Sequence, residues 1–400
     1  MWWSLTIAVV AAAAVAYAIG RWLAPALDRR VPERLRAEAA GYLRALGEAV
    51  DGDPGAARDA LSAAARERTD EPELYFALAA LHRASGNHER AARIHQSLSV
   101  RPGMGPREQA RARLELAVDY RRQERVEAAV AEVDAALERA ANDPRALGAA
   151  AEVYEAAGAW ERAAAALGRR VRIGRRDPQL ADRIAHLHAE AALVLLGRAD
   201  PEGARRAVKA SPRPAGTGAR AHLALARGKV ALAGGDAKAA VKLLEAALRA
   251  APAMAEEIWP PLRDALFARG ALAQAEPLLR GLAAEDPGRL AVRVCLGRLL
   301  AAGAADAAIR ELRAVLDADP LFLPARRALS EVLLASAPAA AAGATSNDVR
   351  KEYEGLIASL EALLEGGAGA TKGLRCGRCG RRALAPAWRC GRCGAWDSLA

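Results

Sequence analysis

The chain has 400 residues and a formal net charge of +10, and its aromatic residues are 7 tryptophans, 6 tyrosines and 3 phenylalanines. This length excludes a single ordinary hydrophobic core but not a repeat array, which grows by adding neighbouring units. Alanine, leucine, arginine and glutamate dominate, a composition typical of helical proteins. The charge alone does not indicate a nucleic-acid partner, because arginine and glutamate alternate along most predicted helices, as they do on a solvated helix face.

Residues 1–22 are predicted to form a transmembrane anchor. The stretch from Trp2 to Gly20 has no charged side chain, and as a helix it spans roughly 28 Å, enough to cross the hydrocarbon core. Arginines follow on one side only, beginning at Arg21, which predicts that the rest of the chain is cytoplasmic. A cleaved signal peptide is the alternative, since Ala16 to Ala18 resembles a cleavage site. Nothing basic precedes the apolar run, which favours the anchor.

Residues 23–38 are predicted to be a juxtamembrane connector, and residues 39–335 a solenoid of about eight helical hairpins. Each hairpin has a turn residue, usually glycine, and an alanine five residues later where two helices pack closely. Most turns lie 33 to 38 residues apart, and one gap of 76 has room for a hairpin near Gly197. This period is typical of tetratricopeptide repeats, which bury their apolar faces by stacking. The pairs are Gly52 with Ala57, Gly86 with Ala91, Glu124 with Ala129, Gly158 with Ala163, Gly234 with Ala239, Gly270 with Ala275, and Gly303 with Ala308.

Most repeats also contain an acid followed by proline, which predicts the start of the next helix. The acid can cap that helix, while proline suits its first position, where the N–H has no partner within the helix. An alanine-rich bundle without repeats shares the composition but has no reason to keep this register. The pairs are Glu71 with Pro72, Asp143 with Pro144, Asp177 with Pro178, Asp286 with Pro287, and Asp319 with Pro320.

The fifth hairpin is the least regular. Gly197 has no alanine at the expected offset, and the following residues 211–218 are rich in proline and glycine, which predicts a loop. The pattern leaves open whether the solenoid bends there. Beyond it we predict a linker at 336–348, a helix at 349–365 that caps the last repeat, a second linker at 366–373, and a metal-binding domain at 374–400.

That last domain contains two identical CxxCG segments. Cysteines at this spacing turn both sulfurs toward one ion, and the glycine after each pair lets backbone N–H groups turn toward the thiolates. Four thiolates complete a closed tetrahedral site, which predicts a structural metal ion, with zinc favoured and iron as the alternative. A pair of disulfides is disfavoured in the cytoplasm. The predicted ligands are Cys376, Cys379, Cys390 and Cys393.

The sequence contains no pattern of catalytic residues, so no enzyme activity is predicted and no substrate site is assigned. Cys295 lies among apolar residues of a repeat helix and is predicted to be core. His186 and His188 are two apart on a helix and do not face each other, so they make a poor metal pair. The other histidines are scattered along the chain at positions 82, 88, 95 and 222.

The order of these segments resembles the lipopolysaccharide assembly protein B (LapB) family: a membrane helix, tetratricopeptide repeats and a rubredoxin-like metal knuckle. The stretch RAARIHQSL at 90–98 is similar to an early repeat of that family, and WRCGRCGAW at 388–396 to its second knuckle. The resemblance implies an inner-membrane adaptor of a Gram-negative bacterium that brings the deacetylase LpxC to the protease FtsH. It also carries the ligand role onto the same four cysteines. The alanine-rich middle repeats depart from the family and leave its partner contacts undefined.

Two functions of other classes remain open from the sequence. A rubredoxin-type electron carrier would need iron in the four-cysteine site. A nucleic-acid-binding zinc ribbon is suggested by six arginines around the cysteines, although an acidic protein or phospholipid headgroups would suit the same charge. The tryptophans at 388 and 396 are expected to pack on the knuckle rather than stack on bases. The arginines are Arg375, Arg378, Arg381, Arg382, Arg389 and Arg392.

Overall fold

The computed structural model describes residues 54–67, 71–174, 177–336, 350–351, 354–355, 375–381, 383 and 386–398. Within them the chain is all-helical, as predicted, and its β-structure amounts to isolated bridges such as the one between Arg389 and Trp396. The chain divides into two compact units, one ending at Ala157 and the other beginning at Gly158. The sequence placed no boundary at this hairpin turn.

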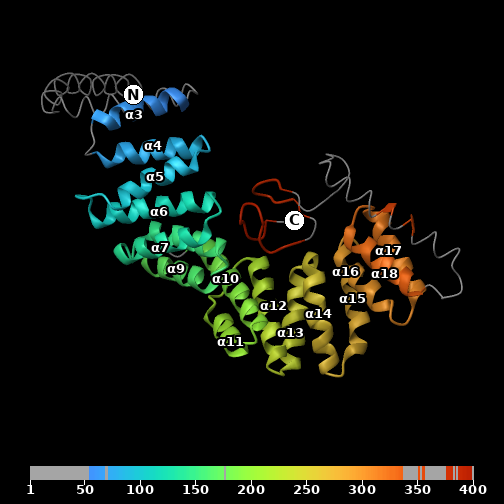
Figure 1. Cartoon of the computed structure of the whole chain (residues 1–400). Helices are drawn as coiled ribbons and strands as arrows, with labels where there is room; N and C mark the ends of the chain where they lie inside the picture. The colour runs from blue at the N-terminus through green and yellow to red at the C-terminus, as the bar shows by residue number, and fades with distance from the viewer. Residues whose placement is uncertain are drawn as a thin grey trace, which may run out of the picture. The chain divides into compact units, whose positions relative to one another are not determined.

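Helices of each unit follow one another as packed antiparallel neighbours (Figure 1). The first unit contains α3 (Pro54–Glu67), α4 (Pro72–Ala84), α5 (His88–Ser99), α6 (Pro106–Arg122), α7 (Val126–Arg139) and α8 (Pro144–Ala156). The second contains α9 (Trp160–Ile173), α10 (Pro178–Gly197), α11 (Pro201–Ala210), α12 (Thr217–Ala233), α13 (Ala237–Ala250), α14 (Ala255–Ala268), α15 (Ala275–Glu285), α16 (Leu290–Leu300), α17 (Ala305–Ala318) and α18 (Leu323–Ser336). Two short 3-10 turns, η1 (Pro252–Met254) and η2 (Leu272–Gln274), precede α14 and α15. This succession of hairpins confirms the tetratricopeptide-like solenoid.

The predicted pairing of a turn with a buried alanine holds in most hairpins. Gly86, Glu124, Gly158 and Gly270 have positive φ, and the alanine five residues after each is fully buried. Gly303 does not adopt positive φ, although Ala308 is buried as predicted. The predicted turn at Gly52 lies outside the described residues.

Two of the predicted turns are wrong in register. In the sixth hairpin the left-handed residue is Gly235 and not Gly234, and Ala240 is the fully buried alanine. In the fifth, Ala199 takes the left-handed turn at φ +58°, and Ala204 is fully buried. The fifth hairpin therefore has the same turn and contact as the others. The sequence concealed it because an alanine occupies the position that glycine usually takes.

The acid and proline pairs start some helices and not others. Asp143 and Asp177 cap α8 and α10 through their carboxylates, with proline as the next residue. Glu71 stands at the start of α4 but makes no side-chain cap. The prediction is wrong at Asp286 and Asp319: each carboxylate accepts from an amide two residues later, and α16 and α18 begin only at Leu290 and Leu323.

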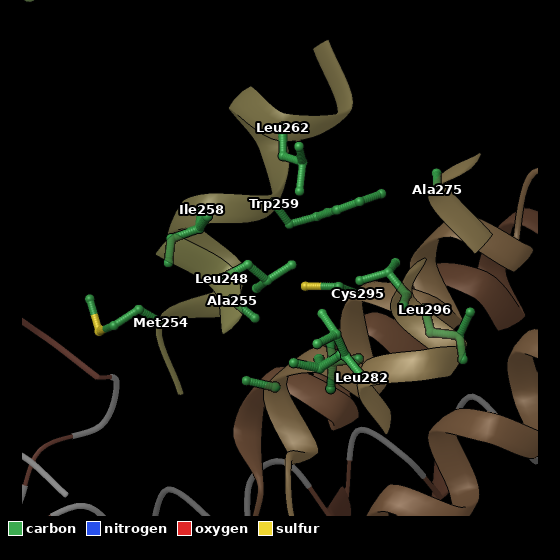
Figure 2. Close-up of a cluster of buried hydrophobic side chains, with 14 of the residues drawn as sticks. Leu248, Met254, Ala255, Ile258, Trp259, Leu262, Ala275, Leu282, Cys295 and Leu296 are labelled. Carbon is green, nitrogen blue, oxygen red and sulfur yellow. The ribbon is translucent and has the colours of Figure 1, made fainter. Parts of the chain in front are cut away.

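Buried leucine, alanine and valine side chains form the core between successive helices of the second unit. Figure 2 shows Cys295 in this core with Leu248, Trp259 and Leu296. Cys295 is 1% exposed, and burial raises the pKa of its thiol to about 12. The prediction that this cysteine is a core residue is confirmed, and its thiol stays protonated and unreactive.

Two glycines allow α12 and α16 to approach their partner helices. A Cβ at Gly297 would lie 2.7 Å from Cγ of Leu312, and one at Gly228 would lie 2.6 Å from Cγ of Leu244. We expect Gly297→Ala to lower the free energy of unfolding by about 1–3 kcal/mol through overpacking. Gly281→Ala is the control, because its Cβ would meet nothing within 4 Å and alanine favours the helix by about 1 kcal/mol. Urea unfolding of both variants measures the difference, and equal stability would contradict the close approach.

Several predicted segments lie outside the described residues. They are the anchor at 1–22, the connector at 23–38, the start of the solenoid up to residue 53, the linker at 336–348 beyond Ser336, the linker at 366–373, and most of the capping helix at 349–365. Of that helix, residues 350–351 and 354–355 are described and are helical. Among the described helices, none has the length and apolar character to span a bilayer.

Candidate metal centre and its contact with the repeat helices

Both CxxCG segments fold as tight turns. Gly380 and Gly394 each have a φ of +69°, a left-handed conformation that glycine adopts without a Cβ clash. In each turn the glycine N–H donates to the carbonyl oxygen of the first cysteine, Cys376 or Cys390, at 2.9 Å. The amides that follow the first cysteine also donate to its sulfur. The predicted role of the two glycines is confirmed.

The two turns bring all four cysteine sulfurs together. Every pair of Sγ atoms lies within 4.8 Å, with 3.5 Å between Cys376 and Cys393 and 3.8 Å between Cys379 and Cys390. All four thiols are free. A tetrahedral zinc ion bound at about 2.3 Å separates its sulfurs by about 3.8 Å. The donor set therefore fits one four-coordinate metal ion.

The surroundings of the sulfurs favour thiolates unequally. The hydroxyl of Ser398, 3.2 Å away, together with backbone amides, lowers the pKa of Cys376 to about 6. The amides of Cys393 and Arg392 lower the pKa of Cys390. The amide of Ala395 favours the Cys393 thiolate, but burial and the three neighbouring sulfurs outweigh it and raise that pKa to about 11. A bound cation would remove this conflict, because it stabilises all four thiolates at once.

Trp388, just before the second CxxCG turn, packs against helices α12 and α14. It is 7% exposed and stacks on His222, with ring centroids 4.5 Å apart and planes 5° from parallel. Its indole N–H donates to Oε2 of Glu257 at 2.9 Å. Trp388 thus fills an apolar site and satisfies its one donor there, as buried tryptophans usually do.

Trp396, just after that turn, makes a second stacked contact. Its ring lies 4.7 Å from that of His186, at 14° from parallel, and meets Trp160 edge-on at 6.3 Å. The guanidinium of Arg389 lies 5.7 Å from the rings of both Trp160 and Trp396. Asp397 accepts from Nε2 of His186 at 2.9 Å. Both tryptophans are packed against protein, but the prediction that they pack on the knuckle is wrong, because their ring partners lie on the repeat helices.

His186 and His222 form a buried pair at the centre of this contact. Their Nδ1 atoms are 2.9 Å apart, so one of them donates and the other accepts. Because the Asp397 carboxylate can only accept, His186 carries a proton on Nε2. Nε2 of His222 has no hydrogen bond and lies 3.7 Å from Oε1 of Glu190. The segment that contains the four cysteines, which we call the knuckle, is therefore held by two indoles, each stacked on one imidazole of a hydrogen-bonded histidine pair.

Sequence reasoning missed this contact surface, which we call the histidine column. It consists of His186, His222 and Glu257, on α10, α12 and α14. Their separations of 36 and 35 residues equal one repeat, so they occupy equivalent positions on successive first helices. The repeat period could have predicted that His186 and His222 lie side by side, whereas the local spacing of His186 and His188 could not. His188 is indeed no partner of His186, and burial lowers its pKa.

We expect the knuckle contact to weaken as pH falls from 7.5 to 6. Burial, His186 and Lys229 lower the pKa of His222 well below its usual value. The docked state therefore binds fewer protons than an undocked one, whose His222 titrates near 6.5, and docking loses up to about 1.4 kcal/mol per pH unit below that value. Burial raises the pKa of Glu190 and of Glu257, an effect of opposite sign that acts at lower pH.

Hydrogen exchange of residues 386–398, corrected for the intrinsic pH dependence of exchange, measures this change. The charged groups that face the ring pair are Glu190, Lys229, Glu257, Arg389 and Asp397. His222→Gln should remove most of the dependence between pH 7.5 and 6. An unchanged profile in that variant would place the titrating group elsewhere.

Comparison with known proteins leaves the family of this chain unassigned. No protein-family profile matches the sequence, and no curated protein matches it. Solved structures that resemble it include residues 41 to the end of MamA from Desulfovibrio magneticus, at 16% identity and a TM-score of 0.31, covering 41% of this chain and 87% of that one. A tetratricopeptide repeat protein from Parabacteroides merdae has 16% identity, a TM-score of 0.31, and coverage of 58% and 99%. The C-terminal part of a repeat protein from Cytophaga hutchinsonii has 13% identity, a TM-score of 0.40, and coverage of 64% and 99%.

Proposed function

We propose that this chain is an inner-membrane adaptor that regulates lipopolysaccharide synthesis in a Gram-negative bacterium by presenting LpxC to FtsH. The observation that carries the proposal is the seating of the four-cysteine knuckle on the repeat helices. Trp388 and Trp396, the flanking tryptophans of the stretch that resembles the LapB family, make that contact. A repeat surface joined to a rigid knuckle offers a composite face for a protein client.

The knuckle holds a structural zinc ion in this proposal, with Cys376, Cys379, Cys390 and Cys393 as its four ligands. Protein sulfurs fill every position of such a site, so no position remains for water or substrate. Iron in the same ligands would favour an electron carrier. Elemental analysis of the purified full-length chain, together with its visible absorption, separates the two metals, and a red iron-loaded protein would contradict the zinc assignment.

Adaptor function requires no catalytic group. Among the histidine, cysteine and acidic side chains that the structure describes, one group lies close enough together to hold a metal ion, and this group is the four cysteines. The side chains of the histidine column already contact Trp388 and Trp396 of the knuckle. We therefore propose a binding role without enzyme activity.

The nucleic-acid alternative rests on the basic side chains of the knuckle. Arg375, Arg378, Arg381 and Arg392 are exposed, and they suit an acidic surface. Trp388 is buried against His222, so it offers no face on which a base could stack. These arginines therefore suit an acidic protein partner, and salt-dependent capture of RNA or DNA by the purified chain would contradict this assignment.

The proposed topology places the repeats and the knuckle on the cytoplasmic side of the inner membrane. We expect a reporter fused after Ala400 to behave as cytoplasmic, because the arginines that begin at Arg21 follow the apolar segment. Moving these basic residues ahead of Trp2 should weaken or invert the orientation. Periplasmic activity of the C-terminal reporter on the unaltered chain would be incompatible with the adaptor function.

Capture of the full-length chain from solubilised membranes, followed by identification of the bound proteins, tests the partners directly. FtsH and LpxC should be enriched with the unaltered chain. A chain lacking the knuckle contact, such as Trp388→Ala, serves as the matched comparison. Enrichment of other proteins with neither FtsH nor LpxC present would reject the proposed partners while leaving a scaffold role.

A further inference from the structure

A basic cavity lies between the first three described helices of the first unit. On α3, Arg58, Ser62 and Arg66 recur every four residues, so they share one face of that helix. His82 of α4 and Arg90 of α5 complete the lining. The cavity has a volume of about 360 Å³, enough for a small anionic group with part of the molecule that carries it.

The positive charge of this cavity is poorly neutralised by the protein. Arg66 and Arg90 are exposed, and no carboxylate pairs with either of them among the described residues. Arg58 contacts Asp59 at 3.3 Å, but both side chains of that pair are substantially exposed, and such a contact contributes little. Three guanidinium groups therefore converge on one cavity with a single carboxylate beside them.

His82 forms the inner wall of the cavity. It is 4% exposed, and its imidazole has no hydrogen-bond partner in the described part of the chain. Burial, then Arg90 and Arg58, lower the pKa of His82, so the ring is neutral at pH 7 and keeps one N–H to donate. The ring nitrogens of His82 are not among the fully buried atoms that lack a partner in the described residues, so they open onto the cavity, where a bound group can accept the N–H.

We propose that this arginine pocket binds a phosphate group, carried either by an anionic lipid headgroup or by a soluble phosphate ester. Guanidinium groups recognise phosphate oxygens through paired hydrogen bonds. A phosphate has more acceptor oxygens than a carboxylate, which matches donors that approach from three helices. Residues 1–22 are predicted to be a membrane anchor, and α3 begins at residue 54, only about thirty residues later in the sequence. The experiment therefore distinguishes a phosphate on a lipid headgroup from one on a soluble ester.

The test uses the full-length chain in nanodiscs with histidines labelled in the imidazole nitrogens. In phosphatidylcholine discs, inorganic phosphate and glycerol 3-phosphate are added as soluble probes, and phosphatidylglycerol discs present the lipid headgroup. The signal of His82 is assigned through His82→Gln. A bound phosphate offsets Arg58 and Arg90 and should raise the pKa of His82 measurably.

Arg66→Gln and Arg90→Gln should each weaken the response at least tenfold, while Arg269→Gln, an exposed arginine of the second unit, should leave it unchanged. A response to the soluble probes identifies a soluble ester site, and a response confined to phosphatidylglycerol discs identifies a lipid site. Absence of a response in both, or a response that persists in Arg66→Gln and Arg90→Gln alike, would overturn the proposal.

Discussion

The full-length Cys379→Ser chain is expected to lose its metal ion and the fold of residues 375–398, while the repeat helices keep their circular dichroism. A segment this short cannot bury a core of its own, and binding of the metal supplies most of its folding free energy. With one thiolate removed, the remaining three leave the site open, and the sulfurs of Cys376 and Cys393, 3.5 Å apart, no longer share a cation.

Metal content and near-ultraviolet circular dichroism measure this result. Cys295→Ala is the matched control, because it also removes a thiol but one that is buried in the repeat core; it should keep the full metal content. Under the proposed adaptor function, Cys379→Ser should cause LpxC to accumulate in cells and lipopolysaccharide to rise, with the amount of the chain in the membrane fraction unchanged. If the variant loses its metal but LpxC turnover stays normal, the knuckle is dispensable and regulation belongs to the anchor and repeats.

Trp388→Ala is expected to keep the metal ion but release the knuckle from the repeats. The substitution leaves all four cysteines in place. It removes the ring that stacks on His222 and the N–H that donates to Glu257, and deletion of a buried tryptophan costs about 3–5 kcal/mol. It also leaves the half-buried carboxylate of Glu257 without its donor, which adds to the loss.

Hydrogen exchange at α12 and α14 and protease sensitivity of residues 375–398 measure the release. Phe267→Ala provides the control, since this aromatic side chain also lies on α14 but is 73% exposed; it should change neither readout. Cys379→Ser removes metal and docking together, whereas Trp388→Ala removes docking alone. Protection of the knuckle at unaltered levels in Trp388→Ala would show that the stacked rings do not hold it.

The sequence predicted what depends on local pattern and period. Glycine turns with a buried alanine five residues later, and cysteines at metal-ligand spacing, follow from the allowed backbone conformations and from close helix packing. The repeat period predicted two turn positions wrongly. In the fifth hairpin Ala199 adopts the left-handed conformation although it is not glycine, and in the sixth the left-handed residue is the glycine after Gly234. Asp286 and Asp319 failed because an Asx turn and a helix cap have the same sequence signature.

The contact between the knuckle and the repeat helices could not be predicted from local sequence patterns. It joins residues that are far apart in the chain, such as His186 and Asp397, which are separated by 211 positions. Hydrophobic patterns do not report such contacts, since the groups involved are buried imidazoles and partly exposed carboxylates. The repeat period would have placed His186 beside His222, but nothing in the sequence showed that a tryptophan from the C-terminal segment stacks on each ring. The basic cavity at Arg58, Arg66 and Arg90 was hidden likewise, because its arginines read as part of a solvated helix face.

The half-life of LpxC tests the proposed adaptor function most directly. It is to be measured after synthesis is stopped, in a Gram-negative host whose own copy of this chain is deleted, with the unaltered chain or Trp388→Ala restored at matched levels. We expect LpxC to have a long half-life in the deletion strain, a short one with the unaltered chain, and a long one with Trp388→Ala, with each difference depending on active FtsH. An LpxC half-life that is the same in the deletion and in the restored strain would contradict the proposed function.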